Sequence, residues 1–126
     1  MTSVPRLTHS ETARFDPDRA AELVAEMGEA GAERLIGRSL EDIAVALNRI
    51  ERAGRSGDRE RIKKTAREIA AIADYAGFST LGRVARDALR TADTGSDAAH
   101  YAVLARLLRV GESTLMPVCD MRNMPI

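Results

Sequence analysis

Apolar residues recur at alternating steps of four and three along two stretches of this chain, and this spacing limits the folds that it can adopt. The two series are Ile36, Leu40, Ile43, Leu47 and Ile50 in residues 32–53, and Ile62, Ala66, Ile69, Ala73 and Ala76 in residues 58–76. Such spacing places an apolar stripe along one side of an α-helix, whereas a strand would show strict alternation. A helix of this kind buries its stripe against other helices, so the pattern predicts a helical bundle.

Composition supports helices over a sheet. Aromatic residues make up only 3% of the 126 residues, there is no Trp, and alanine and leucine dominate the apolar set. A sheet would be expected to contain more β-branched and aromatic residues. A chain of this length corresponds to one domain with a core of its own.

Start and stop signals divide the chain into five helical segments. Asp16 and Pro17 open a short first helix, which Gly28 or Gly31 ends. Further breaks are expected near residues 54–57, 77–78 and 94–96, with Asp58, Ser79 or Thr80, and Ser96 opening the helices that follow. Short loops favour antiparallel neighbours. The prediction is an all-α fold, in which residues 15–112 form an up-and-down four-helix bundle with a short additional N-terminal helix.

Two terminal segments fall outside this pattern. Residues 1–14 are polar and unpatterned, and residues 113–126 contain apolar residues without a helical period. Pro117 and Pro125 are expected to prevent a long helix there. The C-terminal tail either packs along the bundle or docks onto a partner.

Several functional classes are disfavoured. Lys plus Arg and Asp plus Glu both number 19, so there is no net positive charge to indicate nucleic-acid binding. The single Cys119 suits a reducing compartment, no apolar run approaches the roughly 20 residues of a membrane span, and the N-terminus lacks the apolar core of a secretory signal. A cytoplasmic location is therefore expected.

The catalytic inventory is small. His9 is expected to be solvated and His100, in the first turn of the last helix, to lie at the surface or its boundary. Together with Cys119 they show no metal-ligand spacing, and the chain has neither a GK[ST] phosphate loop nor a GxSxG motif. We therefore predict no enzyme, no metal and no cofactor.

One helix face is unusual because small residues interrupt its charged side chains. The stretch KKTAREIAAIADYAGFSTLGRVA, residues 63–85, places six residues on one face at steps of three and four, opposite to the apolar seam. They are Lys63, Lys64, Arg67, Ala70, Ala71 and Asp74. This stripe is either a docking surface or a solvated face whose alanines serve helix propensity.

The same stretch resembles the histidine phosphotransfer (HPt) domain of bacterial phosphorelays. That family has a short leading helix before a four-helix bundle, and its histidine lies in a pattern close to AHxLKGxxxxxG. Gly77 matches the final glycine, Ala66 the alanine and Ile69 the leucine, while RAGRSGDRERIKKTA is similar to the usual lead-in. The resemblance covers roughly residues 17–111 and places Arg67 where the family has its phospho-accepting histidine.

The departures from the family concern its chemistry. Arg67 replaces the histidine, and Ala70 and Ala71 replace the lysine and glycine that follow it. Arginine stays protonated, so it has no free lone pair with which to attack an aspartyl phosphate. A small residue near the histidine lets a receiver domain approach closely in the family, and Ala71 still permits this. The resemblance thus implies a fold and a docking surface without phosphotransfer.

The predicted function is a non-phosphorylatable adaptor in two-component signalling that binds a receiver domain of a response regulator or a histidine kinase. One alternative is an active phosphotransfer protein that uses another residue, such as His100. A second alternative is a helical scaffold or dimerisation protein unrelated to signalling. No oligomeric state is predicted.

Overall fold

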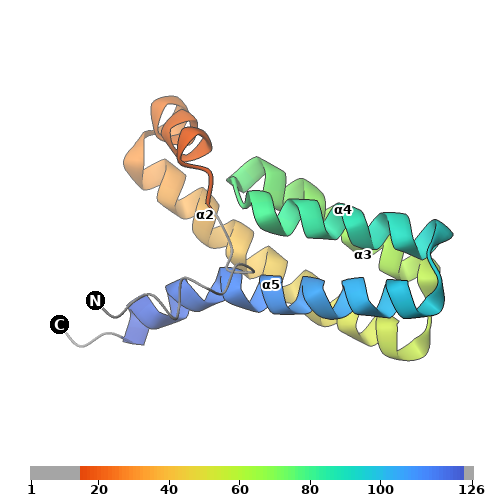
Figure 1. The fold of residues 1–126 in the computed structure, drawn as a ribbon. Helices are drawn as coiled ribbons and strands as arrows, with labels where there is room; N and C mark the ends of the chain where they lie inside the picture. Colours follow the sequence, from red (N-terminus) through yellow and green to blue (C-terminus); the bar gives the residue numbers. More distant parts are fainter. Residues whose placement is uncertain (1–14, 124–126) are drawn as a thin grey trace, which may run out of the picture.

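The computed structural model describes residues 15–123, which form an antiparallel bundle of four α-helices (Figure 1). The helices are α2 (Pro17–Ser56), α3 (Arg59–Ala76), α4 (Ser79–Thr94) and α5 (Asp97–Asn123). Each helix packs against its neighbours along the chain, and α5 closes the bundle against α2. The described residues contain no strand, only an isolated bridge between Phe15 and Phe78. The prediction of an all-α four-helix bundle is confirmed.

The additional N-terminal helix is the first part of α2, before a bend at Gly28. Asp16 caps it by accepting a hydrogen bond from the backbone N–H of Asp18 at 3.0 Å, and Pro17 is its first residue. Gly28 then has φ 78° and ψ 166°, a conformation that residues with a Cβ rarely adopt. The bend folds the leading segment back toward the turn between α3 and α4 (Figure 1).

Polar contacts attach this leading segment to the end of α3. The backbone N–H of Asp16 donates to the carbonyl of Gly77 at 2.8 Å, and Nε of Arg19 donates to the carbonyl of Tyr75 at 2.9 Å. The Arg19 guanidinium also lies 5.0 Å from the centre of the Tyr75 ring. A cation there compensates the partial negative charge at a helix C-terminus. Leu23, on the same segment, is fully buried.

The breaks between helices occur where they are expected. Gly57 and Gly77 end α2 and α3 in the left-handed conformation, with φ 70° and 93°. Asp58 caps α3 through a 3.2 Å hydrogen bond from the N–H of Arg61. Ser96 accepts a hydrogen bond from the N–H of Ala99 at 3.1 Å, at the start of α5. Local chemistry therefore sets these boundaries, except at the start of α4, where the N-cap is Phe78 and neither Ser79 nor Thr80 supplies a cap.

The core contains both apolar series together with the inner sides of α4 and α5. The buried side of α3 includes Ala66, Ala70 and Ala73 and that of α4 includes Gly82. Small side chains let two helices approach closely, and a Cβ on Gly82 would lie 2.4 Å from Oδ1 of Asp74 on α3. The contact between α3 and α4 is therefore tight.

Two expectations about apolar faces and one about α5 are wrong. The apolar pattern of the sequence places Val24 on the packing face of the first helix and Tyr101 on that of the last, but they are 41% and 48% exposed. Pro117 does not end α5, which continues to Asn123. A proline inside a helix removes one hydrogen bond and disturbs the preceding turn, but buried Leu107 and Val110 hold the earlier part of α5 in the core. The expectations for residues 1–14, which include His9, and for residues 124–126 lie outside the described residues.

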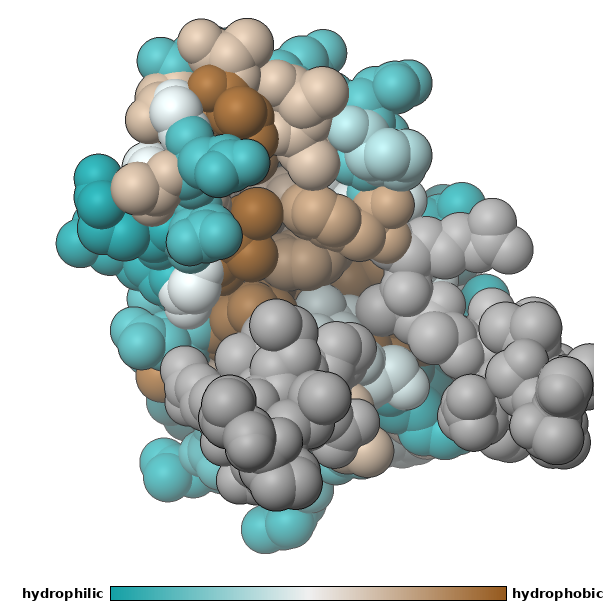
Figure 2. Space-filling view, turned by 90° about the vertical axis from the view of Figure 1, so that its left-hand side faces the viewer, coloured by the Kyte–Doolittle hydropathy of each residue, from teal (hydrophilic) through white to brown (hydrophobic). Residues whose placement is uncertain are grey.

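Figure 2 faces the end of the molecule at which α2 bends. It shows hydrophobic residues in a band between hydrophilic flanks. This is the end at which the leading segment turns away from the rest of α2 (Figure 1).

Among the described residues, no helix combines the length and the apolar character needed to cross a membrane.

A matched pair of glycine substitutions tests the packing of α5 on α2. A Cβ at Gly111 would lie 2.4 Å from Cδ1 and 3.1 Å from Cγ of Leu47, whereas one at Gly37 meets nothing within 4 Å. Gly37→Ala should stabilise the protein by about 0.5–1 kcal/mol through helix propensity. Gly111→Ala should gain the same stabilisation from helix propensity but lose about 1–3 kcal/mol of stability through overpacking. In urea denaturation, Gly111→Ala should be the less stable variant, and equal stability of the two would contradict this packing.

Candidate docking surface

Arg67 lies at the middle of the 18-residue helix α3, and its side chain is exposed. It makes no ion pair or side-chain hydrogen bond with any other described residue. Lys64, nearly one turn earlier, and Ala71, one turn later, are also exposed. The three residues form a surface patch in which two cations, without an ion-pair partner among the described residues, lie beside a side chain too small to obstruct an approaching partner.

The two ends of the predicted stripe are tied to neighbouring side chains. Nζ of Lys63 lies 2.7 Å from a carboxylate oxygen of Asp93 on α4 and 3.4 Å from one of Glu60. The hydrogen bond with Asp93 is the main reason that the pKa of Lys63 is raised above 10.5. Asp74 pairs with Arg86 on α4 at 2.7 Å. Lys63 and Asp74 therefore join α3 to α4, and their charges are locally balanced.

Ala70 does not belong to the exposed face on which it was expected. It is only 9% exposed and belongs to the core. On the helical wheel, Ala70 lies between Asp74, which reaches α4, and the buried Ala66. The two alanines of the predicted stripe thus have different environments: Ala70 packs inside the bundle and Ala71 faces outward.

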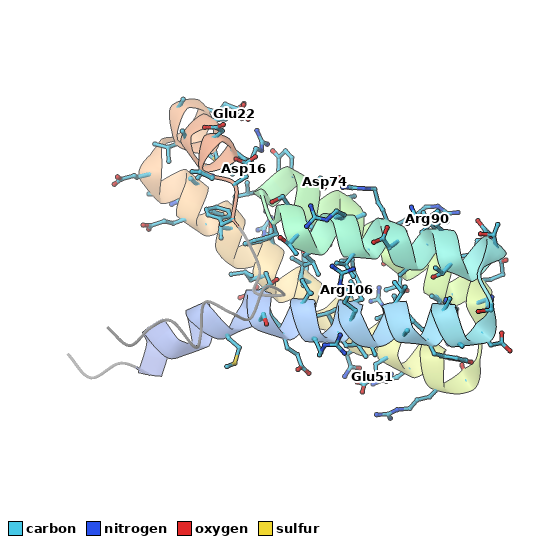
Figure 3. All side chains as sticks on the ribbon, viewed as in Figure 1. Asp16, Glu22, Glu51, Asp74, Arg90 and Arg106 are labelled. Carbon is cyan, nitrogen blue, oxygen red and sulfur yellow. The ribbon has the colours of Figure 1, made fainter. Side chains whose placement is uncertain are left out.

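The expected site, confined to one helix, leaves out the arginines of α4. Arg83, Arg86 and Arg90 are exposed along one side of this helix, and Arg90 pairs with Asp87. Figure 3 labels Arg90 on α4. Arg83 has no ion-pair partner among the described side chains. The sequence did contain a signal for this basic side of the helix: the three arginines are spaced by three and four residues, opposite to the apolar side of α4.

Of these arginines, Arg86 is joined to α3 by its ion pair with Asp74, and Arg83 and Arg90 lie about one turn from it on the same side of α4. We define the α3–α4 face by six exposed residues of these two helices: the patch on α3 and the three arginines of α4. They are Lys64, Arg67, Ala71, Arg83, Arg86 and Arg90. Because Lys64, Arg67 and Arg83 are unpaired among the described residues, this face has a surplus of positive charge.

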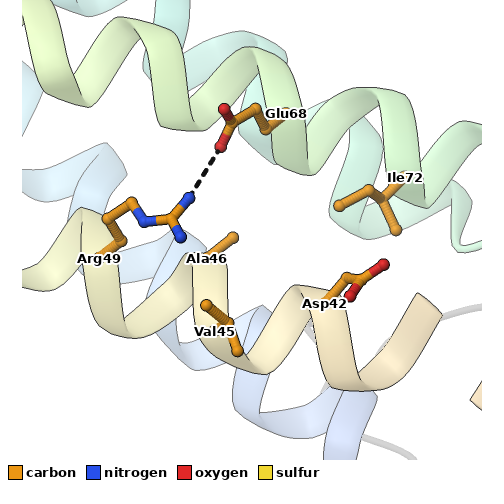
Figure 4. Close-up of a pocket in the computed structure, with 6 residues that line it drawn as sticks. All are labelled: Asp42, Val45, Ala46, Arg49, Glu68 and Ile72. Carbon is orange, nitrogen blue, oxygen red and sulfur yellow. Dashed lines mark hydrogen bonds and ion pairs between the residues drawn. The ribbon is translucent and has the colours of Figure 1, made fainter. Parts of the chain in front are cut away.

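A shallow groove between α2 and α3 borders this face. Its lining consists of Asp42, Val45, Ala46, Arg49, Glu68 and Ile72, and its volume is about 370 Å³ (Figure 4). An ion pair of 3.3 Å between Arg49 and Glu68 bridges the groove. Val45 is 56% exposed there. The groove offers a short apolar strip formed by Val45, Ala46 and Ile72.

His100 is not at the surface or its boundary, as the sequence suggested, because its side chain is only 1% exposed. Its Nδ1 lies 3.4 Å from Oγ1 of Thr91 on α4. The ring therefore offers no nitrogen to a partner that approaches the folded bundle. Arg67 and His100 also lie on different helices, so no second acceptor position is formed at the α3–α4 face.

No protein-family model matches this chain, and neither does any curated protein or solved structure. Within the described part of the chain, no three His, Cys, Asp or Glu side chains gather in a way that could hold a metal ion.

The different environments of the two alanines lead to a stability prediction. Ala70→Glu forces a carboxylate into the contact between α3 and α4 and should cost more than about 2 kcal/mol. Ala71→Glu has the same helix propensity at an exposed position and should change stability by less than about 0.5 kcal/mol. Thermal or urea denaturation of both variants checks this. Similar losses in the two variants would show that Ala70 is not packed as described.

Proposed function

We propose that this protein is an HPt-like adaptor of phosphorelay signalling that docks a receiver domain or a histidine kinase without accepting a phosphoryl group. The observation that carries the proposal is the position of Arg67. It is exposed and unpaired among the described residues at the middle of α3, where the resemblance to HPt domains places their phospho-accepting histidine. The four-helix bundle agrees with the fold of that family.

The chemistry of Arg67 argues against phosphotransfer. A phospho-accepting imidazole attacks the aspartyl phosphate with a ring nitrogen lone pair. A guanidinium has no free lone pair and keeps its charge at all physiological pH values. The same planar cation can donate two parallel hydrogen bonds to a carboxylate. We infer that Arg67 exchanges the nucleophile of the family for an ion-pairing group.

The acidic site of a receiver domain is the partner surface that this arginine fits. Receivers hold a metal ion and a phosphoryl group with a cluster of acidic side chains, and Arg67 would meet these carboxylates as a paired cation. Ala71 leaves room for the approach. Lys64 and Arg83 add attraction that weakens with salt, whereas the charge of Lys63 is offset by Asp93. Arg67 then favours the unphosphorylated receiver and competes with genuine phosphotransfer proteins.

The alternative based on His100 is disfavoured by the burial of its ring, which leaves no approach for a phosphoryl group. The scaffold alternative predicts that no receiver binds at the α3–α4 face. Binding measurements therefore separate the proposal from that alternative.

A labelling experiment tests the absence of phosphotransfer. Incubated with a phosphorylated receiver, the protein should take up no acid-labile phosphate. Arg67→His should restore little, because Ala70 and Ala71 stand where the family has lysine and glycine. Label on the unmodified protein that disappears in His100→Ala would contradict the proposal.

A binding experiment tests the role of the arginine. Truncating one partner of a buried charge pair costs about 2–5 kcal/mol, whereas an exposed pair contributes less than about 1 kcal/mol. Arg67→Ala should therefore weaken receiver binding at least tens-fold, and Ala71→Glu should abolish it. Arg38→Ala removes an exposed arginine of α2 and should leave binding unchanged. Calorimetric titration of candidate receivers at low and moderate salt gives these affinities.

If Arg67→Ala binds as tightly as the parent, Arg67 does not enter the acidic site. If Arg38→Ala and Arg67→Ala weaken binding equally, the attraction is general and not centred on α3. If none of the candidate receivers or kinases binds the parent protein, the adaptor function itself is wrong.

A further inference from the structure

His100 is buried at the end of the bundle where α3 and α5 begin and α4 ends. Its ring is 1% exposed, and its Nε2 is a buried nitrogen without a hydrogen-bond partner. Among the described side chains, no other buried nitrogen or oxygen is left unpaired in this way. An unpaired buried polar atom costs about 1–3 kcal/mol, so this position calls for a physical explanation.

The hydrogen bonds of Thr91 indicate which ring nitrogen carries the proton. Oγ1 of Thr91 lies 3.1 Å and 3.2 Å from the carbonyl oxygens of Asp87 and Ala88, to which it donates its hydrogen. The same oxygen can then accept a hydrogen bond from Nδ1–H of His100, at 3.4 Å. This assignment leaves Nε2 as a bare lone pair. A proton added to Nε2 would find no acceptor.

The charges around the ring also disfavour protonation. Arg59 of α3 donates to the carbonyl of Ala92 on α4 at 3.2 Å and pairs with the carboxylate of Asp97 on α5. Burial of the imidazole lowers the pKa of His100 below 6.5, the nearby Arg59 lowers it further, and Asp97 opposes them more weakly. The third helix against this site, α4, contributes the neutral hydroxyl of Thr91.

We propose that His100 is a proton-operated latch, which holds the start of α5 against α4 while neutral and releases it when the ring is protonated. A charged ring cannot remain buried with an unpaired N–H beside a guanidinium, so the proton is accommodated by moving the ring into water. The release is local because α5 begins directly after Gly95 and Ser96, at the free end of the bundle. The buried Leu107 and Val110 hold the middle of α5 in place.

The direction of the pH dependence follows from proton binding. The closed state binds a proton less readily than the open state, since the pKa of His100 is lowered only when the ring is buried. The latch is therefore fully closed above pH 6.5 and weakens as the pH falls below it. Between 6.5 and the pKa of the closed state, the opening equilibrium rises by up to about tenfold per pH unit.

Nuclear magnetic resonance of the full chain tests the latch. The chain has only two histidines, so the ring of His100 can be assigned by comparison with His9→Ala. The ring of His100 should titrate below pH 6.5. Between pH 7.5 and 5.5, amide protection factors, which correct for the pH dependence of intrinsic exchange, should fall for residues 97–104 and hold steady for α3.

Two variants complete the test. His100→Phe fills the same space without a titratable group and should remove the pH dependence at residues 97–104, whereas His9→Ala should retain it. A midpoint for His100 at or above 6.5 overturns the latch, as does a uniform loss of protection across all helices. The titration of the parent protein decides the matter even if His100→Phe fails to fold.

Discussion

The close contact between α3 and α4 is the constraint on which the position of Arg67 depends. Alanines on the inner side of α3, with Gly82 on α4, let the two helices approach until Asp74 lies against Gly82. Ion pairs at either end of this contact, from Lys63 to Asp93 and from Asp74 to Arg86, also join the two helices. Arg67 points outward because it lies on the exposed side of α3, away from the residues that the helix buries.

The bundle was predictable from local and periodic signals, but the exact edge of its buried surface was not. Gly57, Asp58 and Gly77 act through their own backbone conformations and hydrogen bonds, so their roles are visible in the sequence. Alanine fits a buried or an exposed helix position equally well, so the sequence does not separate Ala70 from Ala71. Their difference arises only when α4 covers one of them. The α4 arginines join the site for the same non-local reason.

Two further features show tertiary structure overriding local preference. Pro117 is a poor helix residue, yet α5 continues through it. His100 follows a polar cap and lies in the first turn of a helix, a place typical of surface residues. It is buried because Arg59 and Thr91, which come from other helices, surround the start of α5. Neither contact is signalled by the residues next to His100 in the chain, so only the assembled bundle shows it.

The distribution of charge gives the docking proposal a basis that is independent of family resemblance. The chain as a whole is neutral, yet Lys64, Arg67 and Arg83 stand without ion-pair partners among the described residues on one face. Among the described residues, carboxylates without an ion-pair partner lie elsewhere, including exposed Glu29 and Glu33 where α2 bends, as do further exposed arginines such as Arg38. Even paired surface charges add little to stability, so folding does not require this separation. Under the docking proposal, the field of an acidic partner attracts the unpaired cations of the α3–α4 face. In the proposed docking, this is the face on which exposed Ala71, one turn from Arg67, leaves room for contact.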